Sequence, residues 1–409
     1  MARIIPVRPP IIAPRPTISG TGFKNKRTGF GALIAPHSVL AGSGTAGDTS
    51  VVRLNGGHYI GLQQISSGFR DGPTQRGIED GWIQEIKDEP TVSGFRVIKF
   101  WRYWEGPTQG DYTRGYAYID HLRAINETGA GAPKRWMVCI LPCVFANTTS
   151  NIWPEYYLAS GAYAATGNSN STAVTGYTAD VWNAATMSKL IALHIAIEAR
   201  YGDPSSPHYD PYFEASATSE TAIAFPQGGT PGSYSSTAER VQYQRVATEF
   251  RASTPRGQLV FGTNYLGTNT NMYALLNTIR SCELCAGGPD TWGPQWIASG
   301  HRALQGDLCR RGELWTPGGA TTLEDMRDTL AFQNQVQGPE IGGYMTDEEA
   351  NRGPFTCPEL FDTANNVNRS QYMVWERNTT YGTSAQKWST GQLPFIRANP
   401  LTHTASPYG

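Results

Sequence analysis

The sequence predicts an α/β protein built as a (β/α)8 barrel, and three observations support this. Short apolar segments alternate with amphipathic helical segments from residue 57 to about residue 380, a pattern typical of βα units around a parallel sheet. Eight such units fit within roughly 320 residues, a length that suits a closed barrel with insertions better than an open sheet. No strand is followed by the glycine fingerprint of a dinucleotide-binding fold or by a phosphate-binding loop.

The expected strands are short, apolar and bounded by turn residues. The run 136–144 (WMVCILPCV) is the most apolar of them and suits a strand buried on both faces. The complete set of expected strands is 58–65, 95–103, 136–144, 211–217, 258–266, 283–287, 340–346 and 371–375.

Helices are expected between these strands because apolar residues recur three or four positions apart. Ile78, Trp82 and Ile86 share one face of the first helix, and residues 181–201 carry the clearest helical pattern of the chain. The long polar segment 147–177 is expected to be a loop rich in Trp and Tyr. The expected helices are 78–88, 116–128, 181–201, 238–252, 272–281, 323–336 and 357–367.

The ends of the chain differ from its middle. Five prolines interrupt residues 1–22, which are therefore expected to be an extended arm that lies on a barrel groove or a neighbouring subunit, and not a secretion signal. The organisation predicted is an arm over 1–22, a Gly-rich connection over 23–56, the barrel over 57–380 and an extension over 381–409.

Composition excludes several classes of function. Charged residues make up 16% of the chain and the net charge is −1, so neither nucleic acid nor a membrane surface is an expected partner. The sequence contains no run of 18 apolar residues, so no transmembrane helix is expected. Cys282 and Cys285 form an isolated C-x-x-C, which is too little to predict a zinc or redox site, and no metal or cofactor is expected. The six cysteines permit disulfides without requiring them.

Residues 94–121 (GFRVIKFWRYWEGPTQGDYTRGYAYIDH) suggest a class of ligand. An apolar strand ends there in a cluster that includes Arg102, Trp104 and Glu105. Aromatic faces stack on the C–H surfaces of sugars, while arginine and carboxylate groups bind hydroxyls. An ordinary strand, loop and helix with aromatic packing is the alternative interpretation of the same residues.

This segment resembles the second strand and following loop of the (β/α)8-barrel glycoside hydrolases of the large retaining clan, which includes cellulase-like and β-galactosidase-like families. The clan pattern is W-x-x-[LW]-E-P, a short gap, G-x-Y and a helix carrying I-D. Here Glu105 is followed by Gly106 before Pro107, which departs from the pattern. The resemblance implies a barrel that cleaves glycosidic bonds with two carboxyl groups.

In that clan the acid/base glutamate ends the fourth strand and the nucleophile ends the seventh. Glu220 matches the first position, although Ser219 stands before it where the commonest motif has Asn. Asp347, Glu348 and Glu349 lie near the second position, and which of the three would point inward stays open. The alternatives are a helix N-terminal charge for Glu220 and a solvated acidic turn for the cluster.

Further substrate contacts are expected from residues at or just after strand ends. Tryptophans there could form sugar platforms or could simply anchor long loops. His58 and His194 are expected to be hydrogen-bonded core residues. The complete set of expected substrate-binding residues is Arg102, Trp104, Glu105, Asn264, Tyr265, Trp292 and Trp375.

Two functions stay open on the sequence. One is a glycoside hydrolase-like protein that acts on a polysaccharide, including a phage virion component that degrades host surface glycan. The other is a non-catalytic virion protein whose barrel binds glycan or only builds structure. A virion or extracellular location without a signal peptide is expected, with the cytoplasm as the other option.

Overall fold

The computed structural model is described over the larger of two compact units, Asp48–Gly409. The predicted arm 1–22, the segment 23–56, the helix 323–336 and the strand 340–346 lie outside the described residues. The described ranges are 57–62, 73–144, 146–149, 151–167, 171–221, 223–262, 266, 269–287, 357–362, 372–376 and 388–401.

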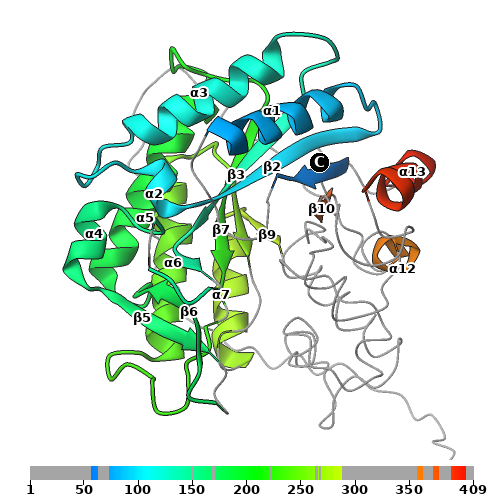
Figure 1. Ribbon diagram of the computed structural model, residues 1–409. Helices are drawn as coiled ribbons and strands as arrows, with labels where there is room; N and C mark the ends of the chain where they lie inside the picture. Colours follow the sequence, from blue (N-terminus) through cyan, green and yellow to red (C-terminus); the bar gives the residue numbers. More distant parts are fainter. Residues whose placement is uncertain are drawn as a thin grey trace, which may run out of the picture. The chain divides into compact units, whose positions relative to one another are not determined.

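The centre of this unit is a parallel sheet in which seven strands are described (Figure 1). All six neighbouring pairs in it are parallel. In sheet order the strands are β10 (Tyr372–Glu376), β1 (Gly57–Gly61), β2 (Val92–Phe100), β3 (Arg135–Leu141), β7 (Phe213–Glu220), β8 (Leu259–Gly262) and β9 (Cys285–Gly287).

The strand order is that of a (β/α)8 barrel. Strands follow one another in chain order from β1 to β9, and β10 near the end of the chain pairs with β1 from Gly57↔Tyr372 to Gly61↔Glu376. A last strand beside the first is what closes a barrel into a ring. The α/β class and barrel fold predicted from the sequence are therefore confirmed, with the predicted seventh strand among the residues not described.

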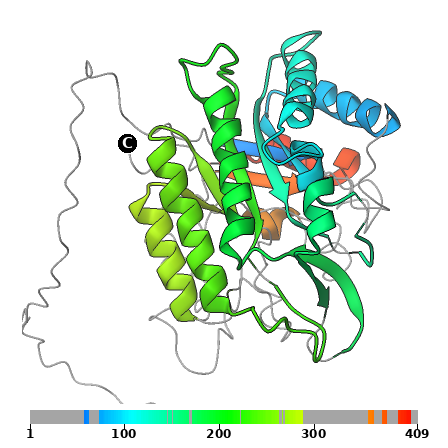
Figure 2. The same ribbon diagram turned by 90° about the vertical axis from the view of Figure 1, so that its left-hand side faces the viewer.

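Helices connect the strands and cover the outside of the sheet. Figures 1 and 2 show α5, α6 and α7 packed side by side along one flank. The π-helical turn η1 (Glu198–Gly202) continues α5, and η4 (Trp388–Gln392) precedes the last helix. The helices that cover the sheet are α1 (Pro73–Lys87), α3 (Thr113–Glu127), α5 (Ala184–Ile197), α6 (Ser236–Ser253), α7 (Asn269–Ser281), α12 (Cys357–Asp362) and α13 (Leu393–Ala398).

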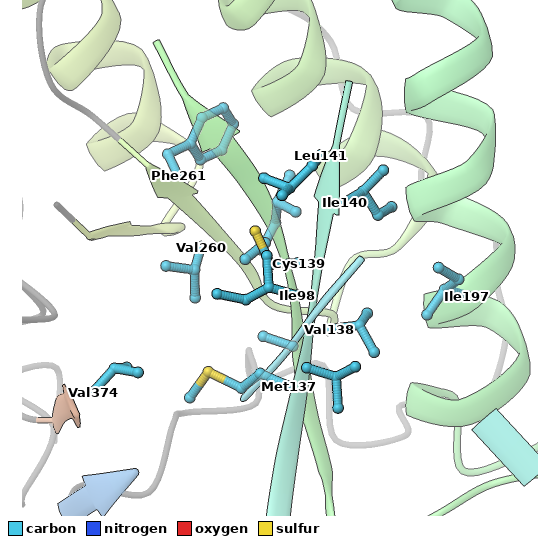
Figure 3. Packing of buried hydrophobic residues seen from close by; sticks show 14 of the residues in the cluster. Ile98, Met137, Val138, Cys139, Ile140, Leu141, Ile197, Val260, Phe261 and Val374 are labelled. Carbon is cyan, nitrogen blue, oxygen red and sulfur yellow. The ribbon is translucent and has the colours of Figure 1, made fainter. Parts of the chain in front are cut away.

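Strand β3 is covered on both faces of the sheet, which explains why its sequence is apolar without interruption. Val138 and Ile140 point toward the helix layer that contains Ile197, whereas Met137 and Cys139 point to the opposite side of the sheet (Figure 3). All four of these strand residues are buried. A parallel strand covered on both faces has no solvent side, so its sequence does not alternate between apolar and polar residues.

Several expected element boundaries were wrong, among them that of the strand predicted over 136–144, which ends at Leu141. The strand predicted over 95–103 ends at Phe100, because Trp101–Trp104 forms the one-turn helix α2, in which both tryptophans are buried. The loop predicted over 147–177 contains α4 (Glu155–Ser160) and an antiparallel sheet ordered β4 (Cys143–Val144), β6 (Val174–Ala179) and β5 (Tyr163–Gly167). Thr, Tyr and Val recur in β5 and β6, and these residues favour strands.

The chain after β10 returns to the start of the barrel. Trp388 donates its indole Nε1–H to Glu85 of α1 over 2.7 Å, and Arg397 of α13 pairs with Glu89 over 2.7 Å. Ile396 of α13 is fully buried. Within the described ranges, no helix is long and apolar enough to cross a membrane.

Candidate functional site

The site is sought at the carboxyl ends of the parallel strands, because ligands of such barrels bind at that edge. Two carboxylate residues end described strands there: Glu220 is the last residue of β7, and Glu376 is the last residue of β10. Strand β7 is the fourth of the barrel, so Glu220 stands at the strand end where the sequence places it. Its role as acid/base stays a prediction.

The backbone that carries Glu220 contains a β-bulge. Ala217 pairs with Val260 and Glu220 pairs with Gly262, so β7 has one more residue than β8 over this stretch. An extra residue bends the strand and increases its twist, and bulges of this kind occur often beside active sites. The pairing of β7 with β8 is therefore irregular at the end of the fourth strand.

Both neighbouring strands hold this bulge in place. The Gly262 N–H donates to the Thr218 Oγ1 over 3.0 Å, and the Thr221 N–H donates to the Gly262 carbonyl over 3.0 Å. From the other side, the Cys139 thiol of β3 contacts the Thr218 carbonyl at 3.4 Å. The backbone on either side of Glu220 is thus held by contacts to both neighbouring strands.

Glu105, predicted to contact substrate, is fully buried and organises the loop after β2. One carboxylate oxygen accepts the Trp101 indole N–H over 2.6 Å, and the other accepts the Gly110 N–H over 2.6 Å. Burial raises the pKa of Glu105, and these hydrogen bonds oppose that shift. The contacts give Glu105 a loop-positioning role at the sheet edge.

Arg102 lies at the rim of the same edge. Its guanidinium pairs with Glu155 of α4 over 2.9 Å, and about a third of its side chain stays exposed. Arg114 of α3 donates to the Arg102 carbonyl over 2.9 Å. The pair therefore connects the end of β2 to the insertion that follows β3.

Two of the three tryptophans predicted to bind substrate lie in the described part of the chain, and both are packed inside the protein. Trp104 is fully buried, donates to the Lys99 carbonyl over 3.2 Å and packs edge-on against Tyr118 of α3. Trp375 is also fully buried, beside Phe395 of α13. With no exposed ring face, neither side chain can stack on a sugar, and both contribute to the layer between sheet and helices.

The two buried histidines are core residues, as expected from the sequence. His58 bonds the Asn399 carbonyl through Nε2 over 2.8 Å and accepts the Trp375 indole N–H at Nδ1 over 2.9 Å. Burial lowers the pKa of His58 to about 4. The His194 Nδ1 lies 3.0 Å from the Ser216 hydroxyl, and burial lowers the pKa of His194 to about 3.

Several predicted site residues lie outside the described part of the chain. The proposed pairing of Glu220 with a carboxylate of the seventh strand therefore stays a prediction. Within the described part, no group of three or more His, Cys, Asp or Glu side chains is placed to hold a metal ion. The predicted residues outside the description are Asn264, Tyr265, Trp292, Asp347, Glu348 and Glu349.

Sequence reasoning missed the aromatic face of the insertion after β3. Tyr163 of β5 and Tyr177 of β6 lie together on the small antiparallel sheet, with their rings 6.2 Å apart. The alternation of Tyr, Thr and Val around a polar turn was the available signal for this hairpin. The high Gly, Ser and Asn content of the segment favoured a loop instead.

Comparisons with known proteins return structures but no family. The sequence matches no family model and no curated protein. An exo-β-1,4-mannosidase from Opitutaceae bacterium strain TAV5 has a TM-score of 0.46 and 11% identity over 87% of this chain. This chain spans 62% of the length of that mannosidase.

Two other solved structures are similar to a comparable degree. An endoglucanase from Thermotoga maritima has a TM-score of 0.46 and 12% identity, with 83% of this chain and 96% of that one covered. Endo-glycoceramidase II from Rhodococcus sp. has a TM-score of 0.45 and 13% identity, with 84% and 78% covered. Likeness at this level establishes no activity for this chain.

Proposed function

We propose that this protein is a glycoside hydrolase-like enzyme that acts on a polysaccharide or oligosaccharide. The observation that carries the proposal is the position of Glu220, which ends the fourth strand of the barrel on a bulged segment fixed by both neighbouring strands. Barrel enzymes carry their chemistry at that edge, which supports a catalytic role for Glu220.

The proposed reaction uses two carboxyl groups. Glu220 donates a proton to the glycosidic oxygen as that bond breaks, while Asp347, Glu348 or Glu349 attacks the anomeric carbon. Water then cleaves the glycosyl–enzyme bond, and Glu220 takes up a proton from that water. This sequence requires Glu220 to be protonated before the first step and ionised before the second.

The test uses substrates that differ in how much acid assistance the leaving group needs. With a natural glycan or an alkyl glycoside, Glu220→Gln should lower turnover by roughly 10²–10⁴-fold, because the proton donor is lost. With a 2,4-dinitrophenyl glycoside the leaving group departs without a proton, so formation of the glycosyl–enzyme should be nearly unaffected. Glu249→Gln, at a partly exposed residue of α6 that pairs with Arg245, is the matched control and should behave like wild type.

The outcomes separate the proposed enzyme from a non-catalytic protein. An equal loss in the rate of glycosyl–enzyme formation on both kinds of substrate would show that Glu220 is not the acid. Unchanged turnover in Glu220→Gln would remove the residue from the mechanism altogether. Binding of glycans by the wild-type protein without hydrolysis of any of them would establish the glycan-binding alternative.

We also propose that the protein is a phage virion component that acts on host surface glycan. The support is the proline-rich sequence of residues 1–22, which suits an extended arm that docks on a neighbouring subunit. Removal of residues 1–22 should leave hydrolysis unchanged and lower the mass of the assembled protein in light scattering. An assembly of unchanged mass would contradict this role for the arm.

A further inference from the structure

The insertion between β3 and α5 has an unusual composition. From Pro142 to Ala179 the chain contains one charged residue, Glu155, among many Asn, Ser, Thr, Tyr, Gly and Ala residues. Glu155 is paired with Arg102 and is therefore not available as a free charge. The surface of this insertion offers hydroxyl groups, amides and aromatic rings with almost no net charge.

The insertion is attached to the edge of the sheet that carries Glu220. It begins directly after β3, and the Pro142 carbonyl there accepts the Ala179 N–H over 2.9 Å and the Trp153 indole N–H over 2.8 Å. The Arg102 N–H, in α2 just after β2, donates to the Ile152 carbonyl over 3.0 Å. In Figure 1 the resulting sheet, with β5 and β6, lies directly below α4.

Two tyrosine rings of this sheet are held in fixed positions. The Tyr163 ring stacks on the fully buried Trp153 with centroids 4.7 Å apart and an interplanar angle of 21°. The Tyr177 ring meets the Tyr163 ring edge-on at 6.2 Å and 78°. Both tyrosines are partly buried, and neither is fully enclosed. Rings braced by a core tryptophan lose little conformational entropy when a ligand stacks on them.

A polar partner lies beside these rings. The Tyr177 hydroxyl donates to the Asn147 side-chain oxygen at 3.3 Å, and Asn147 is exposed. An amide supplies both a donor and an acceptor, which suits a sugar hydroxyl that acts as both. An exposed amide and two partly buried tyrosine rings thus lie together on this small sheet.

We propose that Tyr163, Tyr177 and Asn147 form a binding surface for an uncharged glycan. This inference rests on the proposed function, since it makes the insertion the place where the substrate chain is held next to the Glu220 edge. The pyranose C–H faces lie on the tyrosine rings, and ring hydroxyls exchange hydrogen bonds with Asn147. The absence of Lys and Arg from residues 142–179 leaves no cation there to pair with a uronate or sulfate group.

The experiment measures how far each glycan retards the protein in affinity gel electrophoresis. It uses the Glu220→Gln variant, so that the glycan chain stays intact. Gels contain hydroxyethyl cellulose, β-mannan, galactomannan or xyloglucan as neutral probes, or alginate as the anionic one. Tyr177→Ala and Asn147→Ala should each raise the dissociation constant for the neutral glycan that retards the parent protein. The increase should be about tenfold for Tyr177→Ala. Tyr177→Phe should retain most of the binding, because the ring remains.

The control is Tyr209→Ala, which removes an exposed tyrosine from the turn before β7 at the opposite edge of the sheet. It should bind like the parent. Binding by Tyr177→Ala and Asn147→Ala that equals the parent would overturn the proposal, as would equal retardation by alginate, or no retardation of the parent in any neutral gel. Because no hydrolysis is measured, a failure of the proposed enzyme would leave this result unaffected.

Discussion

The Trp101 indole N–H donates to the Glu105 carboxylate over 2.6 Å, within the same turn of chain that ends β2. The second carboxylate oxygen accepts the Gly110 N–H over 2.6 Å, so Glu105 closes the loop between them. Neither Glu105 nor Trp101 is exposed to solvent. The two donors, Trp101 and Gly110, each bind a different oxygen of the Glu105 carboxylate. Both donors can be paired only while the side chain has two acceptor oxygens.

Glu105→Gln should therefore destabilise the protein although it preserves the shape of the side chain. The glutamine has one acceptor oxygen, so its NH₂ group would face a donor and leave buried polar groups unpaired. We expect a loss of about 1–3 kcal/mol in the free energy of unfolding, measured by urea titration. The control Glu127→Gln, at an exposed residue of α3, should change that free energy by less than about 0.5 kcal/mol.

If Glu105→Gln proved as stable as the control, the carboxylate would not be holding the loop. Intact stability with weakened glycan binding would instead return Glu105 to the substrate-binding role predicted from the sequence.

Glu198 is another of the buried carboxyl groups and lies at the opposite edge of the sheet. Burial raises the pKa of Glu198 to about 8, and the nearby Arg251 only partly opposes the shift. Its Oε2 atom has no hydrogen-bond partner among the described residues. Gly202 and Gly257 pack so closely on the carboxyl group that a Cβ on either would overlap it.

This raised pKa has a definite consequence for stability. Between about pH 4.5 and pH 8 the unfolded chain releases the Glu198 proton while the folded chain retains it, so folding becomes less favourable as pH rises. The change is about 1.4 kcal/mol for each pH unit in that window. Below the window the carboxyl group is protonated in both states and contributes no pH dependence.

Glu198→Gln should remove this dependence, because the amide keeps the shape and never ionises. Relative to wild type, the variant should gain stability as pH rises from 5 to 7.5, in thermal or urea unfolding. Glu249→Gln, at a partly exposed residue of α6, should show the pH profile of wild type. Parallel profiles for Glu198→Gln and wild type would mean that the Glu198 carboxyl titrates normally.

Much of the fold could be predicted because burial on both faces leaves a clear pattern. The run in β3 and the helical spacing in α5 each have one explanation, and the structure confirms both. The end of β2 could not be placed, because Trp101 and Trp104 extend its apolar run without a break. Only the packing of both rings against neighbouring elements makes residues 101–104 a helical turn.

The site was predictable in position more than in orientation. Glu220 could be assigned to a strand end because a carboxylate after an apolar strand is conspicuous. Trp375 was misassigned because neighbouring residues of a strand face opposite sides, and the sequence does not reveal which side is the barrel interior. The structure settles this for Trp375, whose indole contacts His58 and Phe395 in the helix layer.

The contact between Trp375 and His58 leads to a prediction about acid stability. The Trp375 indole N–H donates to Nδ1, which is the nitrogen that protonation would require, while Nε2 bonds the Asn399 carbonyl. His58 is thus neutral in the folded protein, with a pKa lowered to about 4 by burial. The unfolded chain takes up this proton near pH 6.5, so stability is complete above pH 6.5 and falls as pH drops toward 4.

His58→Asn, which keeps an acceptor but cannot become charged, should flatten this decline by about 1.4 kcal/mol per pH unit in urea unfolding. The decline should not vanish, because burial also lowers the pKa of His194. Trp375→Phe should act differently: without the indole donor Nδ1 is free to bind a proton, so the pKa of His58 should rise in an NMR titration. A wild-type His58 that titrates near its ordinary pKa of 6.5 would show that this part of the barrel wall is open to water, and would contradict the buried bond to Trp375.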